Sequence, residues 1–186
     1  MAGSANLIVD LGNGTVKFKS RDRKGKFKST IERTDELNEI KNTVVYDNKA
    51  YVLGYGGNYD REYNKVKKEN WIYQLLLALN LGTTSQDINV CLLLPTSQAA
   101  FKEEYVNKLK NKMFKYRVEN KSVVKNVKKV MVLSEGAVGY KALGIKQGNT
   151  LILDLGSRTL NIAILDSNGN VIKKITEAIG VFDKAS

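Results

Sequence analysis

The chain contains two stretches with the same order of apolar and polar positions. Each is an apolar strand that ends in Asp-Leu-Gly, then a short polar turn, a second strand that begins at Thr15 or Thr159, and a further turn and strand. Residues 7–28 and 151–172 align without gaps at an offset of 144 (151 minus 7), with eight identities in 22 positions. One Asp-x-Gly is typical of an ordinary hairpin turn. Two copies in register predict an internal duplication.

A mixed α/β pattern separates the two copies. The short apolar segments 43–46 and 50–53 predict strands around a polar turn at 47–49. Residues 89–94 form a continuous apolar run that predicts a buried strand, which ends at Pro95. Two further strands are predicted at residues 116–120 and 126–133.

Three helices are predicted between these strands. The first begins at a cap on Asp60 and runs to residue 80. Its apolar positions at near-helical spacing are Val66, Trp71, Leu75 and Leu79. The pattern therefore predicts one long helix that buries these four side chains.

The other two helices are shorter. The second begins at a cap on Thr96 or Ser97 and ends near residue 112. Its inward positions are predicted to be Ala100, Tyr105 and Leu109. The third covers residues 135–143, between a cap on Ser134 and a stop at Gly144.

The composition is that of a globular protein without disulfides. The 186 residues are 42% hydrophobic and 26% charged, which suffices for one sizeable domain. Cys91 is the single cysteine, and its lack of a partner predicts a reducing, cytoplasmic setting. The absence of histidine excludes Ser-His and Cys-His catalysis. No apolar stretch reaches the roughly 20 residues of a membrane span, so no membrane partner is expected.

The net charge of +11 raises the question of an anionic partner. Lysines occur in four segments, at residues 17–28, 65–68, 102–129 and 173–174, mostly beside apolar or acidic neighbours. Such spacing favours a solvated lysine-rich surface. A surface that attracts phosphates or contacts a polymer is the alternative.

The duplicated turn has the residue types of a phosphate-binding loop. Its small residues let a phosphate chain approach several backbone amides, and the hydroxyls of Thr15 and Thr159 can add hydrogen bonds. Lys17 follows on the same strand face and can neutralise a phosphate. Asp10 and Asp154, each at the carboxyl end of a strand, suit a hydrated Mg²⁺. Two such turns facing each other would hold one nucleotide from both sides.

These motifs resemble those of the actin, Hsp70 and sugar-kinase superfamily. Residues 10–17 (DLGNGTVK) resemble its first phosphate motif, residues 154–159 (DLGSRT) its second, and residues 134–140 (SEGAVGY) the helix that connects the two lobes. The order and spacing of the motifs, over nearly the whole chain, resemble the plasmid-segregating ParM-type actin-like proteins. Arg158 departs from the commoner Gly or Thr of the second turn.

The resemblance implies an α/β fold, the ribonuclease H-like first lobe of an actin-like ATPase. Residues 5–149 would form that lobe, with a mixed sheet flanked by helices, and residues 150–186 would begin the second lobe. The resemblance further implies an ATPase that binds ATP and Mg²⁺, forms filaments with itself or a full-length relative, and reaches DNA through an adaptor protein. Phosphate would be held by Gly12, Asn13, Gly14, Thr15, Lys17, Gly156, Ser157, Arg158 and Thr159, metal by Asp10 and Asp154, and the attacking water by Glu135.

The second lobe of such a fold would continue past Gly180, whereas this sequence stops at Ser186. We therefore expect a shortened actin-like protein in which residues 150–177 leave one apolar face and open edges. Because an adenosine pocket would be lacking, ATP should bind well below the affinity of a complete relative. Micromolar or tighter binding by the monomer would contradict this expectation.

Three other functions stay open. The chain could be a non-catalytic module that caps or regulates filaments of a full-length relative. It could be a small-molecule kinase of the same superfamily, although no carboxylate base for an acceptor hydroxyl can be assigned. Direct DNA binding through the lysines is the third.

Overall fold

The computed structural model describes residues 4–35, 40–60, 62, 64–144, 148–177 and 179–180. The strands are β1 (Ala5–Leu11), β2 (Thr15–Lys19), β3 (Lys24–Lys28), β4 (Thr30–Arg33), β5 (Thr43–Tyr46), β6 (Lys49–Leu53), β7 (Asn58–Tyr59), β8 (Asp87–Leu94), β9 (Lys112–Val118), β10 (Lys121–Ser134), β11 (Thr150–Leu155), β12 (Leu160–Leu165) and β13 (Val171–Glu177). The helices are α1 (Trp71–Gly82), a 3-10 helix (Thr96–Phe101), α2 (Lys102–Leu109) and α3 (Glu135–Leu143).

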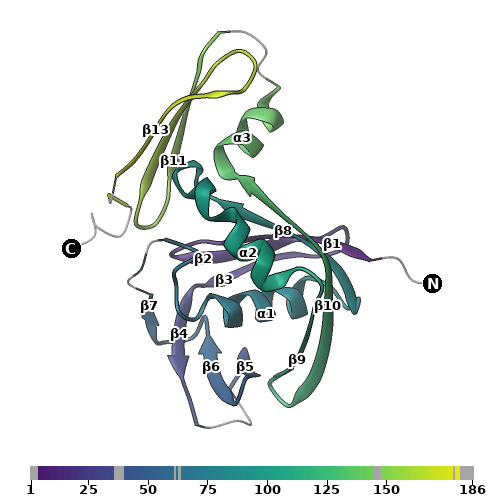
Figure 1. The fold of residues 1–186 in the computed structure, drawn as a ribbon. Coiled ribbons are helices and arrows are strands. Elements are labelled where there is room, and N and C mark those ends of the chain that lie inside the picture. Colours follow the sequence, from purple (N-terminus) through teal and green to yellow (C-terminus); the bar gives the residue numbers. More distant parts are fainter. Residues whose placement is uncertain are drawn as a thin grey trace.

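The strands form two sheets, as Figure 1 shows. The larger sheet has ten strands in the order β3-β2-β1-β8-β10-β9-β5-β6-β4-β7, and the smaller has three in the order β11-β12-β13. Helix α3 lies on the chain path between the sheets, and the boundary predicted at residue 149 falls between β10 of one sheet and β11 of the other. The predicted mixed α/β class is confirmed.

Three parallel strands bring distant residues to one edge of the larger sheet. Strand β8 pairs in parallel with β1 and with β10, and Leu93 is level with both Asp10 and Leu133. Because the carboxyl ends of parallel strands meet at one edge, Asp10, Pro95 and the start of α3 come together there. The continuous apolar run predicted to be a buried strand is β8, which begins two residues earlier, at Asp87, and stops before Pro95 as predicted. Alternate side chains of β8 are buried, and those between them are half-buried.

The two sequence repeats fold into the same unit. In each, three consecutive antiparallel strands form a meander, β1-β2-β3 in the larger sheet and β11-β12-β13 in the smaller. Asp10 is paired with Lys17 in the first unit, and Asp154 with Asn161 at the matching position of the second. The predicted turn after β12 is present, with Gly169 at a φ of 82°.

Helix α1 lies in the core and is apolar on nearly every side. Five consecutive residues, Leu75 to Leu79, have no exposed surface, and the helix packs on β1, β2 and β3. Trp71, at its start, meets the ring of Tyr105 from α2 edge-to-face at 4.8 Å between centroids. Gly82, at its end, lies against Leu7, whose Cδ1 would be only 2.5 Å from an added Cβ.

The helix boundaries differ from those predicted. The first helix begins at Trp71 rather than Asp60, because residues 64–70 form turns in which Lys65 and Lys68 are buried. The second starts as the 3-10 helix, becomes α-helical at Lys102 and ends at Leu109. Tyr105 and Leu109 are buried as predicted, whereas Ala100 is exposed. The third helix has its predicted bounds, with Gly144 left-handed at its end.

The predicted strands were partly displaced. Strands β5 and β6 agree with prediction within one residue. The segment 116–120 instead ends β9 at Val118, since Glu119 adopts a φ of 55° in the turn to β10. Strand β10 then starts at Lys121, five residues before the predicted start at 126, because it extends the hairpin with β9.

The smaller sheet exposes apolar side chains, as predicted for residues 150–177. Leu151, Leu153 and Leu155, at alternate positions of the edge strand β11, are 59%, 61% and 60% exposed. Within the described parts of the chain, no helix has the length and apolar character needed to cross a membrane.

Candidate functional site

The two repeated turns open onto one cavity of about 270 Å³. Its lining includes Asp10 and Asp154 from the ends of β1 and β11, and Glu135 from the first turn of α3. Of the predicted site residues, all but Arg158 line it: Asp10, Gly12, Asn13, Gly14, Thr15, Lys17, Glu135, Asp154, Gly156, Ser157 and Thr159. The structure therefore brings together residues that are far apart in the sequence.

Both turns have a glycine packed against the carbonyl of a threonine three residues later. An added Cβ on Gly12 would lie 2.4 Å from the Thr15 oxygen, and one on Gly156 would lie 3.2 Å from the Thr159 oxygen. The N–H of Gly156 donates to that Thr159 oxygen at 2.8 Å. Behind the first turn, Ser29 donates from its hydroxyl to the Asn13 carbonyl at 2.6 Å. These close approaches require small residues and hold the turns in a tight shape.

A buried lysine lies between two carboxylates of the cavity. The Nζ of Lys65 is 2.6 Å from Oδ1 of Asp10 and 2.5 Å from Oε1 of Glu135. The Lys65 side chain is 5% exposed, whereas its two carboxylate partners are partly exposed at the cavity wall. Burial by itself lowers the pKa of Lys65, but the charges of Asp10 and Glu135 outweigh it and raise the pKa above its ordinary value. Lys65 is therefore held as a fixed cation.

Burial strongly perturbs the pKa of Glu135. Burial raises its pKa to about 7, against the opposing charge of Lys65, and the charge of Asp10 and a hydrogen bond with Asp154 act in the same direction as burial. Asp10 and Glu135 thus share one buried ammonium, whereas Asp154 contacts Glu135 rather than a lysine. An opposite charge favours the ionised form of a carboxylate, so a further cation fits beside Asp154.

The repeat extends to the residue that faces each aspartate. Lys17 Nζ lies 3.7 Å from Oδ2 of Asp10, and Asn161, its equivalent at an offset of 144 (161 minus 17), donates to Oδ2 of Asp154 at 3.4 Å. Asp10 therefore has two cationic partners. Asp154 has an amide and a carboxyl group, which leaves its charge the less neutralised of the two.

Arg158 is not among the residues that line the cavity. Its Nη1 donates a short hydrogen bond to the backbone carbonyl of Asp60. Asp60 follows β7 of the larger sheet and Arg158 precedes β12 of the smaller one. This contact therefore links the two sheets on one side of the site.

The carboxylates suit a cation that keeps most of its water. Asp10, Glu135 and Asp154 supply oxygen atoms, the donors that Mg²⁺ prefers. Among the described residues, no group of three or more His, Cys, Asp or Glu is placed to hold a metal directly. The residues present thus fit a hydrated Mg²⁺, which needs only one or two carboxylates, better than an ion held entirely by protein.

Sequence reasoning missed three residues of the site. Lys65 and Lys68 lie in turns that were predicted to be helix, and burial and the charge of Lys65 lower the pKa of Lys68 to about 8. Nζ of Lys68 is 3.5 Å from the Gly12 carbonyl. Nothing local in the sequence marks either lysine. Asn161, in contrast, is predictable from the sequence, because it aligns with Lys17 in the second copy of the repeat.

A three-stranded unit repeated on both sides of a cavity, with one copy inside a large mixed sheet, defines the actin-like class of α/β folds. The sequence model described as the actin like proteins N terminal domain matches residues 9–137. The chain therefore belongs to the actin-like proteins.

Solved structures show the same fold. AlfA from the B. subtilis plasmid pLS32, in a filament, is 22% identical with a TM-score of 0.80, and the match covers 98% of this chain and 74% of AlfA. The archaeal actin homolog Ta0583 in complex with ADP is 19% identical with a TM-score of 0.80, covering 96% of this chain and 62% of Ta0583. Apo psk41 ParM is 20% identical with a TM-score of 0.69, covering 98% of this chain and 68% of ParM.

At these identities the likeness concerns the fold alone. Another AlfA structure is a filament bound to AMPPNP, 23% identical with a TM-score of 0.77, covering 97% of this chain and 72% of AlfA. The chain thus spans between about three fifths and three quarters of the length of these proteins. A search of curated proteins finds no match.

Proposed function

We propose that this chain binds the phosphates of ATP between its two repeated turns and belongs to a nucleotide-dependent filament protein of the plasmid-segregation type. The observation that carries the proposal is the shared cavity, into which both turns and three carboxyl groups open. The family match supports an actin-like protein over a small-molecule kinase. Solved relatives in complex with ADP and AMPPNP support a nucleotide as the ligand.

The two turns would hold the phosphates from opposite sides. Amides of residues 12–15 and 156–159 would donate to phosphate oxygens, because small residues leave room for close approach. Lys17, whose side chain is 65% exposed beside Asp10, would swing toward the β- or γ-phosphate and neutralise part of its charge. Arg158 would support the second turn through Asp60 rather than contact phosphate.

Asp154 and Asp10 would hold a hydrated Mg²⁺ beside the phosphates. When bound, the ion would neutralise charge that develops on the phosphate oxygens. Asp154 would be the stronger contributor, because its partners in the structure carry no positive charge. Lys65 holds one oxygen of Asp10, so that carboxylate would face the ion chiefly with its other oxygen.

Glu135 would position the attacking water. In hydrolysis the water oxygen bonds to the γ-phosphorus, the bond from that phosphorus to the bridging oxygen breaks, and ADP, phosphate and the proton lost by the water leave. Glu135 lies at the cavity wall, where its carboxylate can accept a hydrogen bond from the water. Lys65 fixes the orientation of the carboxylate through Oε1.

We further propose that the chain associates with itself or with a longer actin-like relative in a filament, and that an adaptor protein links the filament to DNA. Structures of AlfA in filaments support self-association. The exposed leucines of β11 supply apolar surface for such a contact.

Binding of a fluorescent ATP analogue to the purified chain, with Mg²⁺ present, tests the site. The parent chain should bind, and Asp154→Asn should weaken Mg²⁺-dependent binding about tenfold or more. Glu135→Gln should leave binding nearly intact and slow phosphate release about 100-fold. Glu103→Gln, which changes an exposed carboxylate on α2, is the matched control and should behave like the parent.

Light scattering tests the filament half of the proposal. ATP or AMPPNP should raise the scattering of the chain, alone or mixed with a longer actin-like relative. Equal binding of the ATP analogue by the parent and Asp154→Asn would refute the proposed site. If nucleotide leaves the light scattering unchanged, both for the chain alone and for its mixture with a longer relative, the filament role is refuted.

A further inference from the structure

Five lysines form a regular array on one face of the β2–β3 hairpin, here named the lysine ladder: Lys17, Lys19, Lys24, Lys26 and Lys28. The register places Lys17 opposite Lys26 and Lys19 opposite Lys24. Because residues directly opposite share a face of an antiparallel pair, all five side chains lie on the same side. The other side carries buried Val16, Phe18 and Phe27, which pack toward α1.

The lysine ladder does not stabilise the hairpin that carries it. Like charges directly opposite each other destabilise a strand pair, and this hairpin contains two such pairs. Lys17 has an acidic partner in Asp10 at 3.7 Å. Among the residues that the structure describes, no carboxylate forms an ion pair with Lys19, Lys24, Lys26 or Lys28. These four lysines therefore present uncompensated charge to solvent.

Protection of a sheet edge accounts for part of the array only. Strand β3 is an edge of the larger sheet, and lysines on an edge strand discourage pairing with another chain. Strand β2 lies between β3 and β1, so it is not an edge. Lys17 and Lys19 on β2 therefore have no protective role of this kind.

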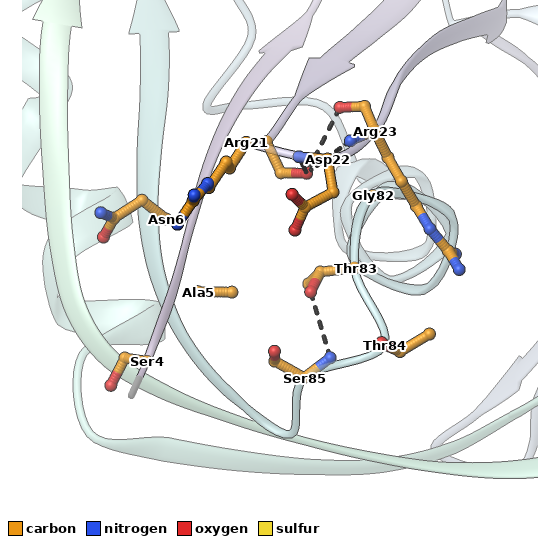
Figure 2. Close-up of a pocket in the computed structure, with 11 residues that line it drawn as sticks. Ser4, Ala5, Asn6, Arg21, Asp22, Arg23, Gly82, Thr83, Thr84 and Ser85 are labelled. Atoms are coloured by element: carbon orange, nitrogen blue, oxygen red, sulfur yellow. Dashed lines mark hydrogen bonds between the residues drawn. The ribbon is translucent and has the colours of Figure 1, made fainter. Parts of the chain in front are cut away.

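The hairpin ends in a turn that carries two arginines. Ser20 accepts hydrogen bonds at its Oγ from the backbone N–H groups of Asp22 and Arg23, at 3.3 and 3.0 Å, which orders the turn. Figure 2 shows Asp22 pointing into a polar cavity of about 480 Å³ beside Thr83, with Arg21 and Arg23 around it. Because a carboxylate points into this cavity, the cavity is less suited than the lysine ladder to bind an anion.

We propose that the lysine ladder contacts the phosphate backbone of duplex DNA directly and without reading its sequence. Lysines two residues apart on a strand are separated by about 6.6 Å, and the two rows lie about 5 Å apart. Duplex DNA carries one negative charge about every 1.7 Å along its axis, so it can neutralise together the four ammonium groups that have no carboxylate partner. An acidic protein would need a carboxylate at each matching position.

The composition of the ladder selects the duplex over single strands. Proteins that bind single strands stack bases on aromatic side chains. Strands β2 and β3 carry lysines on the ladder face and place both of their aromatic residues, Phe18 and Phe27, on the buried face. This direct contact is separate from the adaptor of the proposed function, and it would let a filament hold DNA along its side.

Fluorescence anisotropy with two labelled duplexes of equal length and unrelated sequence tests the proposal. The parent chain should bind both alike, more tightly than a single strand. The logarithm of its affinity should fall linearly with the logarithm of salt concentration, and the slope should shrink by about 0.9 for each ladder lysine removed. The variant Lys19→Gln/Lys24→Gln/Lys26→Gln should bind about tenfold or more weakly at low salt. Lys17 is left unchanged because it lines the candidate nucleotide site.

The matched control is Lys112→Gln/Lys115→Gln/Lys121→Gln, which removes three exposed lysines from the β9–β10 hairpin and the same net charge. It should bind DNA like the parent, and both variants should keep the parent's response to nucleotide in light scattering. If the ladder variant and the control variant lose DNA affinity equally, net charge alone accounts for the binding and the proposal is refuted. A ladder variant that binds DNA normally but loses self-association in sedimentation would assign the face to a second copy, and would also refute it.

Discussion

The Nζ of Lys65 lies 2.6 Å from Oδ1 of Asp10, although the two residues are 55 positions apart in the chain. The same ammonium holds Glu135 at 2.5 Å. One side chain from an irregular segment thus connects the end of β1 to the start of α3. This relationship makes the site a single charged unit rather than two separate turns.

Lys65→Met should therefore be strongly destabilising. It leaves the partly buried Glu135 without its cation and Asp10 with only the exposed Lys17, and removing one member of a buried ion pair costs about 3 kcal/mol or more of the free energy of unfolding. Urea denaturation measures the change. Lys102→Met, which removes a lysine 58% exposed and 3.9 Å from Glu103, should alter stability by less than about 0.5 kcal/mol. Equal free energies of unfolding for Lys65→Met and the parent would show that the ion pairs of Lys65 do not stabilise the fold by this amount.

The two repeated turns offer a comparison of the same substitution at equivalent places. Gly12→Ala puts a Cβ 2.4 Å from the Thr15 oxygen, a contact that the backbone can relieve only by opening the turn. We expect a loss of about 1–3 kcal/mol in the free energy of unfolding. Gly156→Ala places its Cβ 3.2 Å from the Thr159 oxygen and should cost less. Thermal unfolding of both variants checks the order, and equal losses would contradict it.

Lys125 should make stability depend on pH in the alkaline range. Its Nζ donates to the carbonyls of Thr83 and Ser85 at 2.7 and 2.8 Å, and burial, aided by the charge of Arg23, lowers its pKa from 10.5 to about 8. Between these two values the unfolded chain binds more protons than the folded one. The contribution of Lys125 to stability should therefore rise as pH increases from about 8 to 10.5.

The difference in unfolding free energy between the parent and Lys125→Met isolates this effect, because other groups titrate alike in both proteins. The free energy of unfolding of the parent should rise relative to that of the variant as pH increases from 7.5 to 10. Below pH 7 the difference between the two should be constant. A difference that stays flat over the whole range, or that falls as pH rises, would be inconsistent with a lowered pKa.

The exposed face of the smaller sheet should drive association. Leu153 is 61% exposed between Leu151 and Leu155 on the edge strand β11, and an apolar edge strand tends to pair with another chain. Leu153→Glu should lower the average mass seen in sedimentation at high protein concentration. Met113→Glu, on an exposed position of β9, is the control and should keep the parent's mass. Both variants sedimenting alike would remove this strand from the interface.

Much of the fold followed from local pattern. The repeat located Asp10 and Asp154, because each is followed two residues later by a glycine that packs against the backbone oxygen of a threonine. The buried strand β8 and the helix α3 were also predictable, since a continuous apolar run, a terminal proline and a left-handed glycine each act within a few residues.

What local pattern could not supply were the contacts between distant segments. Asp60 was predicted to start a helix, yet α1 begins at Trp71, and the turns before it carry Lys65 to the edge where three parallel strands end. The partners of that lysine lie 55 and 70 residues away, so no short window of sequence contains the reason for its burial.

The sequence by itself determined the residue types of the candidate site, because the small residues and the carboxylate of each turn lie within one short segment. Only the tertiary structure decided which charges meet. Parallel pairing of β1, β8 and β10 sets Asp10 beside α3, and the second repeat packs Asp154 against Glu135. Electrostatic energy depends on distance in space, and sequence separation does not specify that distance.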